Sequence, residues 1–182
     1  MNQNIVPSRP VVDVILLSWN RTDMTIETVE NLVKQQGVIT KIWIVDQGST
    51  PENLTKLQCA VKDYQNVYIK TLGQNVGVPG GRNIGIELGT AEYTVSIDND
   101  AVLESSHGLA NIVRIFESEP EIGIIGFRIM NYYNNKDDEY SWVYPKPLKR
   151  KRDERFLTTT FCGCGHAIRR SVFNQVAGYD AD

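Results

Sequence analysis

Cysteine, histidine and long apolar runs are all scarce in this chain of 182 residues. Its three cysteines are too few and too unevenly placed for a disulfide framework, so we expect a protein of the reducing cytoplasm. No apolar run reaches the roughly 20 residues that cross a bilayer, and the N-terminus lacks the apolar core of a signal peptide. The chain also lacks an excess of positive charge. Its net charge of −3 argues against a general nucleic-acid-binding protein.

What the chain does contain is the composition of an ordinary globular domain, with 41% hydrophobic and 23% charged residues. Apolar stretches of strand length alternate with segments that carry apolar residues at helical spacing. This alternation predicts a single α/β domain over residues 1–182, a Rossmann-like α/β/α sandwich with a mostly parallel central sheet. The expected strands cover residues 11–17, 41–45, 67–70, 93–97 and 122–126.

Two segments fall outside this alternation. Residues 1–10 are polar, contain two prolines and are expected to form a loose lead-in. Residues 131–155 form a polar and basic excursion, after which a return strand is expected over residues 156–161. The basic part of the excursion is interpreted as a solvated loop. The alternative is a surface that contacts phosphates or an anionic membrane, with which the protein would associate peripherally.

The stretch from Tyr93 to Asp100 is the one around which the rest of the chain is interpreted. Its first five residues alternate in the manner of a strand with a buried face, and the strand then ends on Asp98, Asn99 and Asp100. Carboxylate oxygens suit a hard divalent cation such as Mn²⁺ or Mg²⁺. A plain polar turn is the alternative, because Asp and Asn favour turns.

Two earlier strands also end on polar residues, in the segments 18–21 and 46–50. Ligands of open parallel sheets bind beyond the carboxyl ends of the strands, so all three polar ends are expected to gather at one edge. There Asp46 can accept hydrogen bonds from a base or a ribose, and the Asp98 and Asp100 pair can carry a metal that clamps a diphosphate.

The glycine-rich stretch 75–85 precedes a predicted helix and invites comparison with dinucleotide-binding loops. It spells neither G-x-G-x-x-G nor a phosphate loop ending in G-K-[ST], and it follows the third strand instead of the first. A nicotinamide or ATP site is therefore disfavoured. Two interpretations stay open: Gly81 and Arg82 lie beside a nucleotide, or the glycines only permit a tight turn and close helix–sheet packing.

Five motifs in this order over about residues 12–180 resemble the glycosyltransferase family 2 proteins of GT-A fold. Each motif is common alone, and the five together are specific. Gln47 stands where the family more often has asparagine, which leaves Asp46 intact. The motifs are Ser18–Arg21, Val45–Thr50, Asn75–Gly85, Ile97–Asp100 and Cys164–Asp180.

The resemblance implies a GT-A domain that transfers a sugar, with inversion at the anomeric carbon, from a nucleotide-diphosphate sugar to an acceptor hydroxyl. It implies a divalent metal, Mn²⁺ or Mg²⁺, at Asp98 and Asp100. The acceptor is expected to be a saccharide, a lipid-linked molecule or a protein. The C-terminal part of the usual catalytic domain, with a further acidic pair and helices, is expected beyond Asp182. The implied donor-binding residues are Ser18, Asn20, Arg21, Asp46, Gly81, Arg82, Asp98 and Asn99.

Inverting transfer needs a carboxylate that takes the proton from the acceptor hydroxyl. In some relatives the aspartate that matches Asp180 is this base, and in others the base lies in the later acidic pair. Asp180 is therefore the candidate base. The alternative is a structural loop aspartate.

Cys162, Cys164 and His166 alternate, so a strand would present all three on one face. A zinc site made by these residues is one interpretation, although no fourth ligand is evident. His166 alone can also serve as a metal ligand or contact a phosphate. The preferred interpretation is that small residues here let the backbone pass close to the donor sugar or the acceptor.

Two other functions remain beside the glycosyltransferase. A non-catalytic nucleotide-sugar-binding module would bind the donor without turnover. A nucleotidyltransferase would release pyrophosphate from a nucleoside triphosphate, and the absence of a basic glycine-rich N-terminal loop counts against it.

Overall fold

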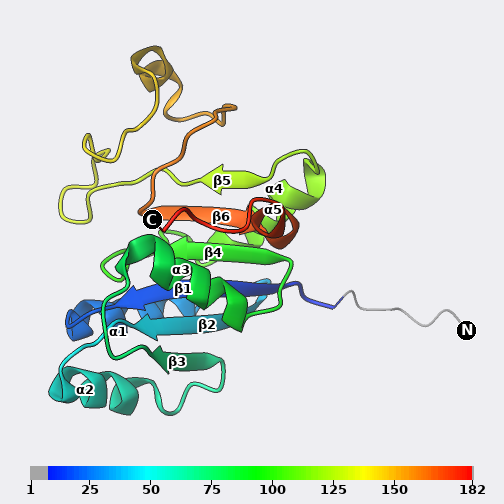
Figure 1. Cartoon of the computed structure of the whole chain (residues 1–182). Helices are drawn as coiled ribbons and strands as arrows, with labels where there is room; N and C mark the ends of the chain where they lie inside the picture. The colour runs from blue at the N-terminus through cyan, green and yellow to red at the C-terminus, as the bar shows by residue number, and fades with distance from the viewer. Residues whose placement is uncertain (1–7, 182) are drawn as a thin grey trace, which may run out of the picture.

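The computed structural model describes residues 8–181 and shows the predicted sandwich of helices around a central sheet (Figure 1). Most of the expected lead-in over residues 1–10 lies outside the described residues, and residues 8–10 belong to no helix or strand. The strands are β1 (Val11–Ser18), β2 (Ile39–Asp46), β3 (Val67–Thr71), β4 (Tyr93–Ile97), β5 (Ile124–Gly126) and β6 (Gly165–Arg169). The helices are α1 (Thr22–Leu32), α2 (Pro51–Val61), α3 (Gly77–Leu88), α4 (Gly108–Ser118) and α5 (Arg170–Gln175), and a 3₁₀ turn, η1, covers Lys146–Lys151.

The strands form one sheet in the order β3-β2-β1-β4-β6-β5 (Figure 1). The first four strands of the chain run parallel, and β6 runs antiparallel to both of its neighbours. In the register of the parallel strands, Ser18 lies opposite Asp46, and Leu16 lies opposite Ile97. The carboxyl ends of β1, β2 and β4 therefore meet at one edge of a mostly parallel sheet.

Alternation along β1 divides the core into two layers. Val12, Val14 and Leu16 face the larger layer, which they share with buried residues of α1, α2 and α4. Ile15 faces the opposite side, where it packs with Ile86 of α3 and with α5. Helices thus cover both faces of the sheet. Within residues 8–181, none of them is long and apolar enough to traverse a bilayer.

Close packing of α3 on the sheet depends on Gly85. A Cβ at this position would fall well inside van der Waals contact with Ile15 Cγ2, and 3.1 Å from Val45 Cγ2. We expect Gly85→Ala to lower the free energy of unfolding by about 1–3 kcal/mol, because overpacking forces the helix off the sheet. Urea denaturation measures this change.

Gly80 on the same helix is the matched control, because a Cβ there would meet only the Val76 side chain, with Cγ2 at 3.3 Å and Cβ at 3.5 Å. Alanine is favoured over glycine inside helices by about 1 kcal/mol, so Gly80→Ala should be neutral or stabilising. Equal losses in both variants would show that Gly85 has no special packing role.

The predicted return strand over residues 156–161 is wrong. That segment belongs to no helix or strand, and the last strand is β6, which begins at Gly165. Threonine and aromatic residues favour strands locally. However, β5 pairs with β6 itself, through Gly126 opposite His166, and this tertiary pairing leaves residues 156–161 without a partner strand.

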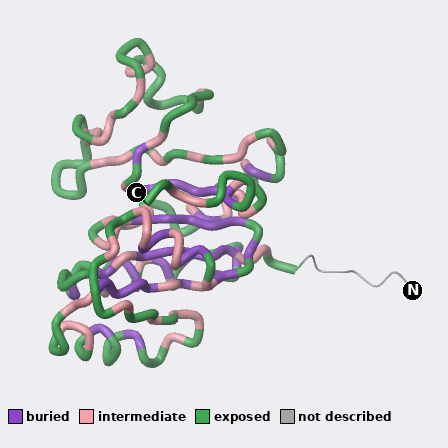
Figure 2. The backbone as a smooth tube through the Cα atoms, viewed as in Figure 1, coloured by how far each residue is buried: buried purple, intermediate pink, exposed green. Residues whose placement is uncertain are grey.

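Residues 128–157, which we call the basic arm, contain the predicted excursion and leave the sheet after β5. Figure 1 shows the arm projecting beyond β5, at the opposite edge of the sheet from β3. Most of its length is exposed or partly exposed (Figure 2). Arg128 bonds Asp137 at 2.6 Å and Asp153 at 2.8 Å. Together with edge-on and tilted ring contacts among Trp142, Tyr144 and Phe156, these ion pairs give the arm its own internal contacts.

Candidate functional site

Asp46 ends β2 and is buried beneath the loop that follows it. Its Oδ1 accepts hydrogen bonds from the backbone N–H groups of Gly48 (3.3 Å) and Ser49 (3.1 Å), and its Oδ2 accepts one from the Ser49 hydroxyl. The N–H of Gln47 donates to the carbonyl of Ser18 at 2.9 Å. Asp46 therefore fixes the shape of the loop after β2, and Ser18 lies beside it at the same edge of the sheet.

Asn20 joins the loops that follow β1 and β2. Its backbone is left-handed, with a φ of 64°, a conformation in which asparagine is enriched. Its Oδ1 accepts from the Thr50 N–H, and its own N–H donates to Ser49 Oγ, both at 2.9 Å. This predicted donor-binding residue thus holds two of the strand-end loops together.

Arg82 of α3 reaches across to the end of β4. The residue is only 7% exposed, and its Nη2 donates to Asp98 Oδ1 at 3.0 Å and to the Gly163 carbonyl at 2.7 Å. The N–H of Asp98 in turn donates to the Cys164 carbonyl at 3.1 Å. Arg82 therefore ties the Asp98 carboxylate to the turn that precedes β6.

Asp98 and Asp100 place two carboxylates close together. Burial raises the pKa of Asp98 above its usual range and the negative charge of Asp100 raises it further, whereas the Arg82 guanidinium lowers it. Arg21 adds a second cation, because its Nη1 lies 2.9 Å from Asp100 Oδ2 in an exposed ion pair. The edge thus has two repelling carboxylates, each paired with an arginine.

The donor set of this pair fits a hard divalent cation. Among residues 8–181, no group of three or more His, Cys, Asp or Glu side chains is placed to hold an ion. Mg²⁺ is commonly bound through one or two carboxylates together with substrate phosphates. Asp98 and Asp100 therefore fit a cation that also binds a diphosphate, and they do not form a metal site closed by protein ligands alone.

A polar stripe on α1 holds the segment that follows β4. Asn99 Nδ2 donates to Thr25 Oγ1 at 3.0 Å, so the Asn99 side chain contacts α1. Further on, Thr28 Oγ1 donates to a backbone carbonyl at 2.9 Å, and Asn31 exchanges hydrogen bonds of 2.9 and 3.0 Å with the backbone of Leu103. Sequence reasoning predicted a role for Asn99 but missed Thr25, Thr28 and Asn31 of α1. Their polar side chains at helical spacing were a visible signal.

Gly81 lies where α3 packs against the loops. A Cβ there would lie 3.0 Å from Leu17 Cδ2 and 3.1 Å from Gln47 Oε1, an oxygen that also accepts from the Val76 N–H at 3.1 Å. The helix begins at Gly77, inside the stretch predicted as a loop. Close helix–sheet packing, one of the two interpretations of these glycines, therefore holds at Gly81.

Asn83 of α3 holds the last described residues. Its Oδ1 accepts from the Tyr179 N–H, and its Nδ2 donates to the Tyr179 carbonyl, both at 2.8 Å. The Tyr179 hydroxyl lies 2.5 Å from His166 Nε2. Asp180, the candidate base, follows directly and is exposed, and the chain runs back from α5 towards the carboxyl ends of the parallel strands (Figure 1). Sequence reasoning did not identify Asn83 or Tyr179.

His166 is fully buried on β6, and burial lowers its pKa to about 4, with the positive charge of Arg82 acting in the same direction. In the unfolded chain an imidazole protonates near pH 6.5, whereas the folded protein keeps it neutral down to about pH 4. We therefore expect this group to lower the free energy of unfolding by about 3 kcal/mol as the pH falls through that window. Denaturant titrations at several pH values measure the loss.

The second histidine, His107, is exposed and provides the control. His166→Phe should remove this part of the pH dependence, whereas His107→Phe should leave it unchanged. The same slope in His166→Phe and in the original chain would contradict the assignment.

The cysteines do not share a strand face with His166. β6 begins at Gly165, so Cys162 and Cys164 precede it, with their Sγ atoms 3.5 Å apart. The ring of His166 faces Tyr179 instead. Because no three or more His, Cys, Asp or Glu side chains among the described residues are placed together to hold an ion, neither the zinc interpretation nor His166 as a metal ligand is supported.

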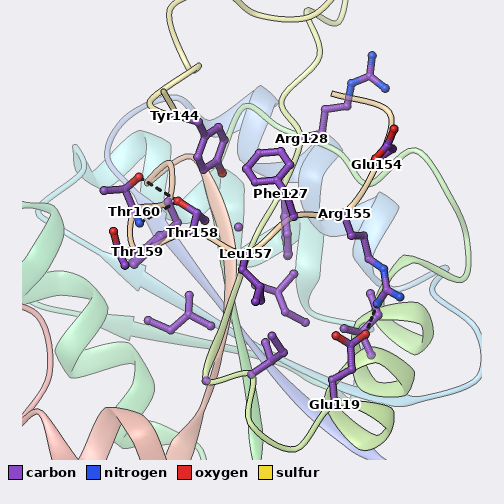
Figure 3. A pocket seen from close by; sticks show the side chains of 18 of the residues that line it. Glu119, Phe127, Arg128, Tyr144, Glu154, Arg155, Leu157, Thr158, Thr159 and Thr160 are labelled. Carbon is purple, nitrogen blue, oxygen red and sulfur yellow. Dashed lines mark hydrogen bonds and ion pairs between the residues drawn. The ribbon is translucent and has the colours of Figure 1, made fainter. Parts of the chain in front are cut away.

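A cavity of about 770 Å³ lies among α4, β5 and the end of the basic arm. Figure 3 shows Phe127, Tyr144 and Leu157 on its apolar side, with Arg155 paired to Glu119 at its rim. Phe161 also lines it, and the Phe161 ring lies 4.7 Å from the His166 ring. The three carboxylates of the strand ends do not line the cavity, so it adjoins their edge without containing it.

Curated relatives match this chain along most of its length. It is 25% identical over 173 residues to an uncharacterised protein of Haemophilus influenzae, covering 92% of each chain. It is 25% identical to the glucosyl-dolichyl phosphate glucuronosyltransferase of Haloferax volcanii, covering 94% of this chain and 56% of the relative. It is 26% identical to the UDP-Glc:alpha-D-GlcNAc-diphosphoundecaprenol beta-1,3-glucosyltransferase WfaP of Escherichia coli, covering 75% of this chain and 52% of that one.

Solved structures of glycosyltransferases share the fold. The mannosyltransferase PcManGT of Pyrobaculum calidifontis, in complex with GDP-Man and Mn²⁺, superposes with a TM-score of 0.77 at 20% identity. Residues 1–349 of TarS from Staphylococcus aureus, in complex with UDP-GlcNAc, give 0.67 at 14% identity. These matches cover 97% and 91% of this chain but 49% and 47% of the others, so the chain spans about half the length of these proteins.

The fold is therefore the predicted GT-A fold, and the match to a family model agrees with it. The model described as glycosyl transferase family 2 covers residues 13–177, from β1 to the end of α5. The chain belongs to glycosyl transferase family 2.

Proposed function

We propose that this chain transfers a sugar from a nucleotide-diphosphate sugar to an acceptor hydroxyl in the cytoplasm, with inversion at the anomeric carbon. The convergence of Asp46, Asp98 and Asp100 with Arg82 carries the proposal, at the carboxyl ends of β2 and β4, which flank β1. Family membership and the structural neighbour that binds GDP-Man with Mn²⁺ support it. The proposed donor-binding residues are Ser18, Asn20, Arg21, Asp46, Gly81, Arg82, Asp98 and Asn99.

The proposed metal ligands are Asp98 and Asp100, with Mn²⁺ or Mg²⁺ as the ion. When bound, the metal neutralises the negative charge that develops on the departing nucleoside diphosphate. Arg82 fixes the orientation of Asp98 through Oδ1, and it favours the ionised carboxylate that binds a metal. Arg21 pairs with Asp100, so this exposed and therefore weak pair must give way or rearrange when a cation binds.

Asp180 is the proposed base, which takes the proton from the acceptor hydroxyl on the face of the sugar opposite to the leaving diphosphate. Its neighbour Tyr179 is held by Asn83 and lies against His166. Because Asn83 adjoins Arg82, one helix positions both the carboxylate side of the donor site and the loop that carries the candidate base.

For the acceptor we propose a lipid-linked molecule, in preference to a free saccharide or a protein. The names of two relatives contain dolichyl phosphate and diphosphoundecaprenol, which are lipid carriers. The cavity beside the strand ends offers apolar walls next to Phe161 and within reach of the turn that contacts Asp98. We propose that part of the acceptor lies in this cavity.

A thermal-shift screen of nucleotide sugars, with and without Mn²⁺, tests the proposal. A donor at about 100 times its dissociation constant should raise the melting temperature by roughly 5–10 °C, and only when the metal is present. Asp100→Ala should abolish both the metal-dependent shift and transfer, as should a chelator. Glu104→Ala, at an exposed carboxylate four residues further on, is the control and should change neither.

The second candidate function is a non-catalytic nucleotide-sugar-binding module. It is favoured by the observation that the chain spans about half of the glycosyltransferases it resembles. Calorimetry with UDP or GDP plus Mn²⁺, together with a donor-hydrolysis assay, separates the two functions. Donor binding without any turnover would favour the module, and retained transfer in Asp100→Ala would refute the metal site.

A further inference from the structure

The basic arm, residues 128–157, differs in charge from the rest of the chain. It holds eight Lys or Arg and five Asp or Glu, a net charge of +3 in a chain whose net charge is −3. Its cations therefore form a positive segment on an otherwise acidic protein. A field of this kind attracts anionic partners to one part of the surface.

Three cations of η1 have no acidic partner among the residues that the structure describes. They are Lys146, Arg150 and Lys151, and all three are exposed. Lys149 in the same turn pairs with Glu139, and Arg152 pairs with Asp137 at 2.7 Å. The arm thus fixes its shape with some of its cations and leaves three others facing solvent within six residues.

The same arm exposes apolar side chains that its own fold does not cover. Tyr140 is 99% exposed, Tyr133 is 89% exposed and Leu157 is 81% exposed. Tyrosine is enriched where proteins meet the headgroup region of bilayers, because the ring is apolar and the hydroxyl reaches water. Of the large apolar residues exposed within residues 8–181, five of twelve belong to the arm, namely Tyr132, Tyr133, Tyr140, Val143 and Leu157.

We infer that the basic arm is a docking surface for a lipid bilayer that contains anionic headgroups. Free cations supply about 1 kcal/mol each near such a surface, and the exposed tyrosines and Leu157 insert at the headgroup boundary. A protein partner explains the positive charge of the arm less well. Three exposed cations that no carboxylate holds in place suit a diffuse anionic surface such as a bilayer. The inference stands on the arm alone and does not depend on the proposed transfer reaction.

Docking of the basic arm would place the proposed reaction at the surface of a bilayer. The chain leads from the arm into β6 through the turn before Gly165, where the Gly163 and Cys164 carbonyls accept hydrogen bonds from Arg82 and from the Asp98 N–H. A bilayer against the arm would therefore lie on the side of the molecule where the cavity opens, and a lipid-linked acceptor would approach from it.

Vesicle co-sedimentation tests the inference with the full chain. The protein should pellet with vesicles of equal parts phosphatidylcholine and phosphatidylglycerol, and not with phosphatidylcholine alone. Changing Lys146, Arg150 and Lys151 together to glutamine should weaken partitioning by about 100-fold. Raising the salt from 0.1 M to 1 M, which shortens the Debye length from about 10 to about 3 Å, should weaken the original chain similarly.

The matched control changes Lys34, Lys62 and Lys70 to glutamine, three exposed lysines on the part of the sheet that holds α1, α2 and β3. This variant has the same net charge and should pellet like the original chain. A second variant, Tyr140→Ser with Leu157→Ser, should also lose partitioning while its melting temperature is unchanged, since both side chains are exposed.

Equal losses in both lysine variants would overturn the inference, because they would reflect net charge alone. Binding to phosphatidylcholine vesicles at the same strength, or no pelleting with either composition, would also overturn it. The donor thermal shift is measured separately without vesicles, so failure of docking and failure of the proposed function are distinguishable.

Discussion

Replacing Arg82 with alanine should lower donor affinity and the rate of transfer by about 100-fold or more. The guanidinium is buried and bonds both the Asp98 carboxylate and the Gly163 carbonyl. Removing one partner of a fully buried pair typically costs about 3–5 kcal/mol. The Asp98 side chain is 42% exposed, so solvent screening reduces the expected loss to about 2–3 kcal/mol. Calorimetry with Mn²⁺ and a nucleoside diphosphate measures the affinity, and a single-turnover assay measures transfer.

The same substitution should also change the pH dependence of metal binding. Arg82 lowers the pKa of Asp98, whereas burial and Asp100 raise it. Without Arg82 the pKa of Asp98 rises further, so the carboxylate becomes protonated at a higher pH as the solution is acidified. The acid limb of metal-dependent donor binding should therefore move to higher pH in Arg82→Ala.

Arg21→Ala is the control, because the Arg21 pair with Asp100 is exposed and should matter by tenfold at most. Arg82→Lys keeps the charge but loses the planar fork, and should recover part of the affinity. Equal effects of Arg82→Ala and Arg21→Ala, or an unmoved acid limb, would show that Arg82 does not act through Asp98.

The position of the site followed from general rules of parallel sheets. Once Ile39–Asp46 and Tyr93–Ile97 are strands of one parallel sheet, their carboxyl ends must share an edge. That rule places Asp46 and Asp98 together from the sequence alone. It says nothing of what the carboxylates bond, and Asp46 proves to be occupied by the loop of Gly48 and Ser49.

Side-chain contacts between residues far apart in the chain could not be predicted from the sequence. Asn83 and Tyr179 are separated by 96 positions, and Thr25 and Asn99 by 74. Each of these side chains is an ordinary polar residue in its local pattern, so only the folded chain reveals its partner. The wrong strand over residues 156–161 has the opposite cause, since its local preference was clear and tertiary pairing of β5 with β6 overrode it.

The candidate site and a buried, stabilising carboxylate occupy opposite ends of β1. Its carboxyl end carries Ser18, which lies beside Asp46 at the site. Near its other end Asp13 is fully buried, and its oxygens accept from Trp43 Nε1 (2.9 Å), the Ala91 N–H (2.7 Å) and Arg170 (3.0 Å). Asp13 therefore joins the first strands to the chain after β6, at the end of β1 opposite to the proposed donor site.

Asp13→Ala should lower the free energy of unfolding by about 3 kcal/mol without touching the proposed donor-binding residues, because it leaves the partly buried guanidinium of Arg170 without its carboxylate partner. Arg170 also donates to the Ala91 carbonyl at 2.6 Å and the Ile86 carbonyl at 2.9 Å, so the cation cannot simply turn to solvent. Urea denaturation of Asp13→Ala, Arg170→Ala and the double variant measures the loss and the coupling. Glu92→Ala, which removes the exposed partner of Arg169, is the control and should cost under about 1 kcal/mol.

The double variant decides whether charge compensation is the cause. If each single change strands the other charge, the double variant should lose clearly less than the sum of the two single losses. Strict additivity would mean that Asp13 and Arg170 stabilise the fold independently, through their separate bonds to Trp43 and to the backbone. In that case separate, independent contacts would hold β1 and the chain after β6, and neither substitution would leave an unpaired charge.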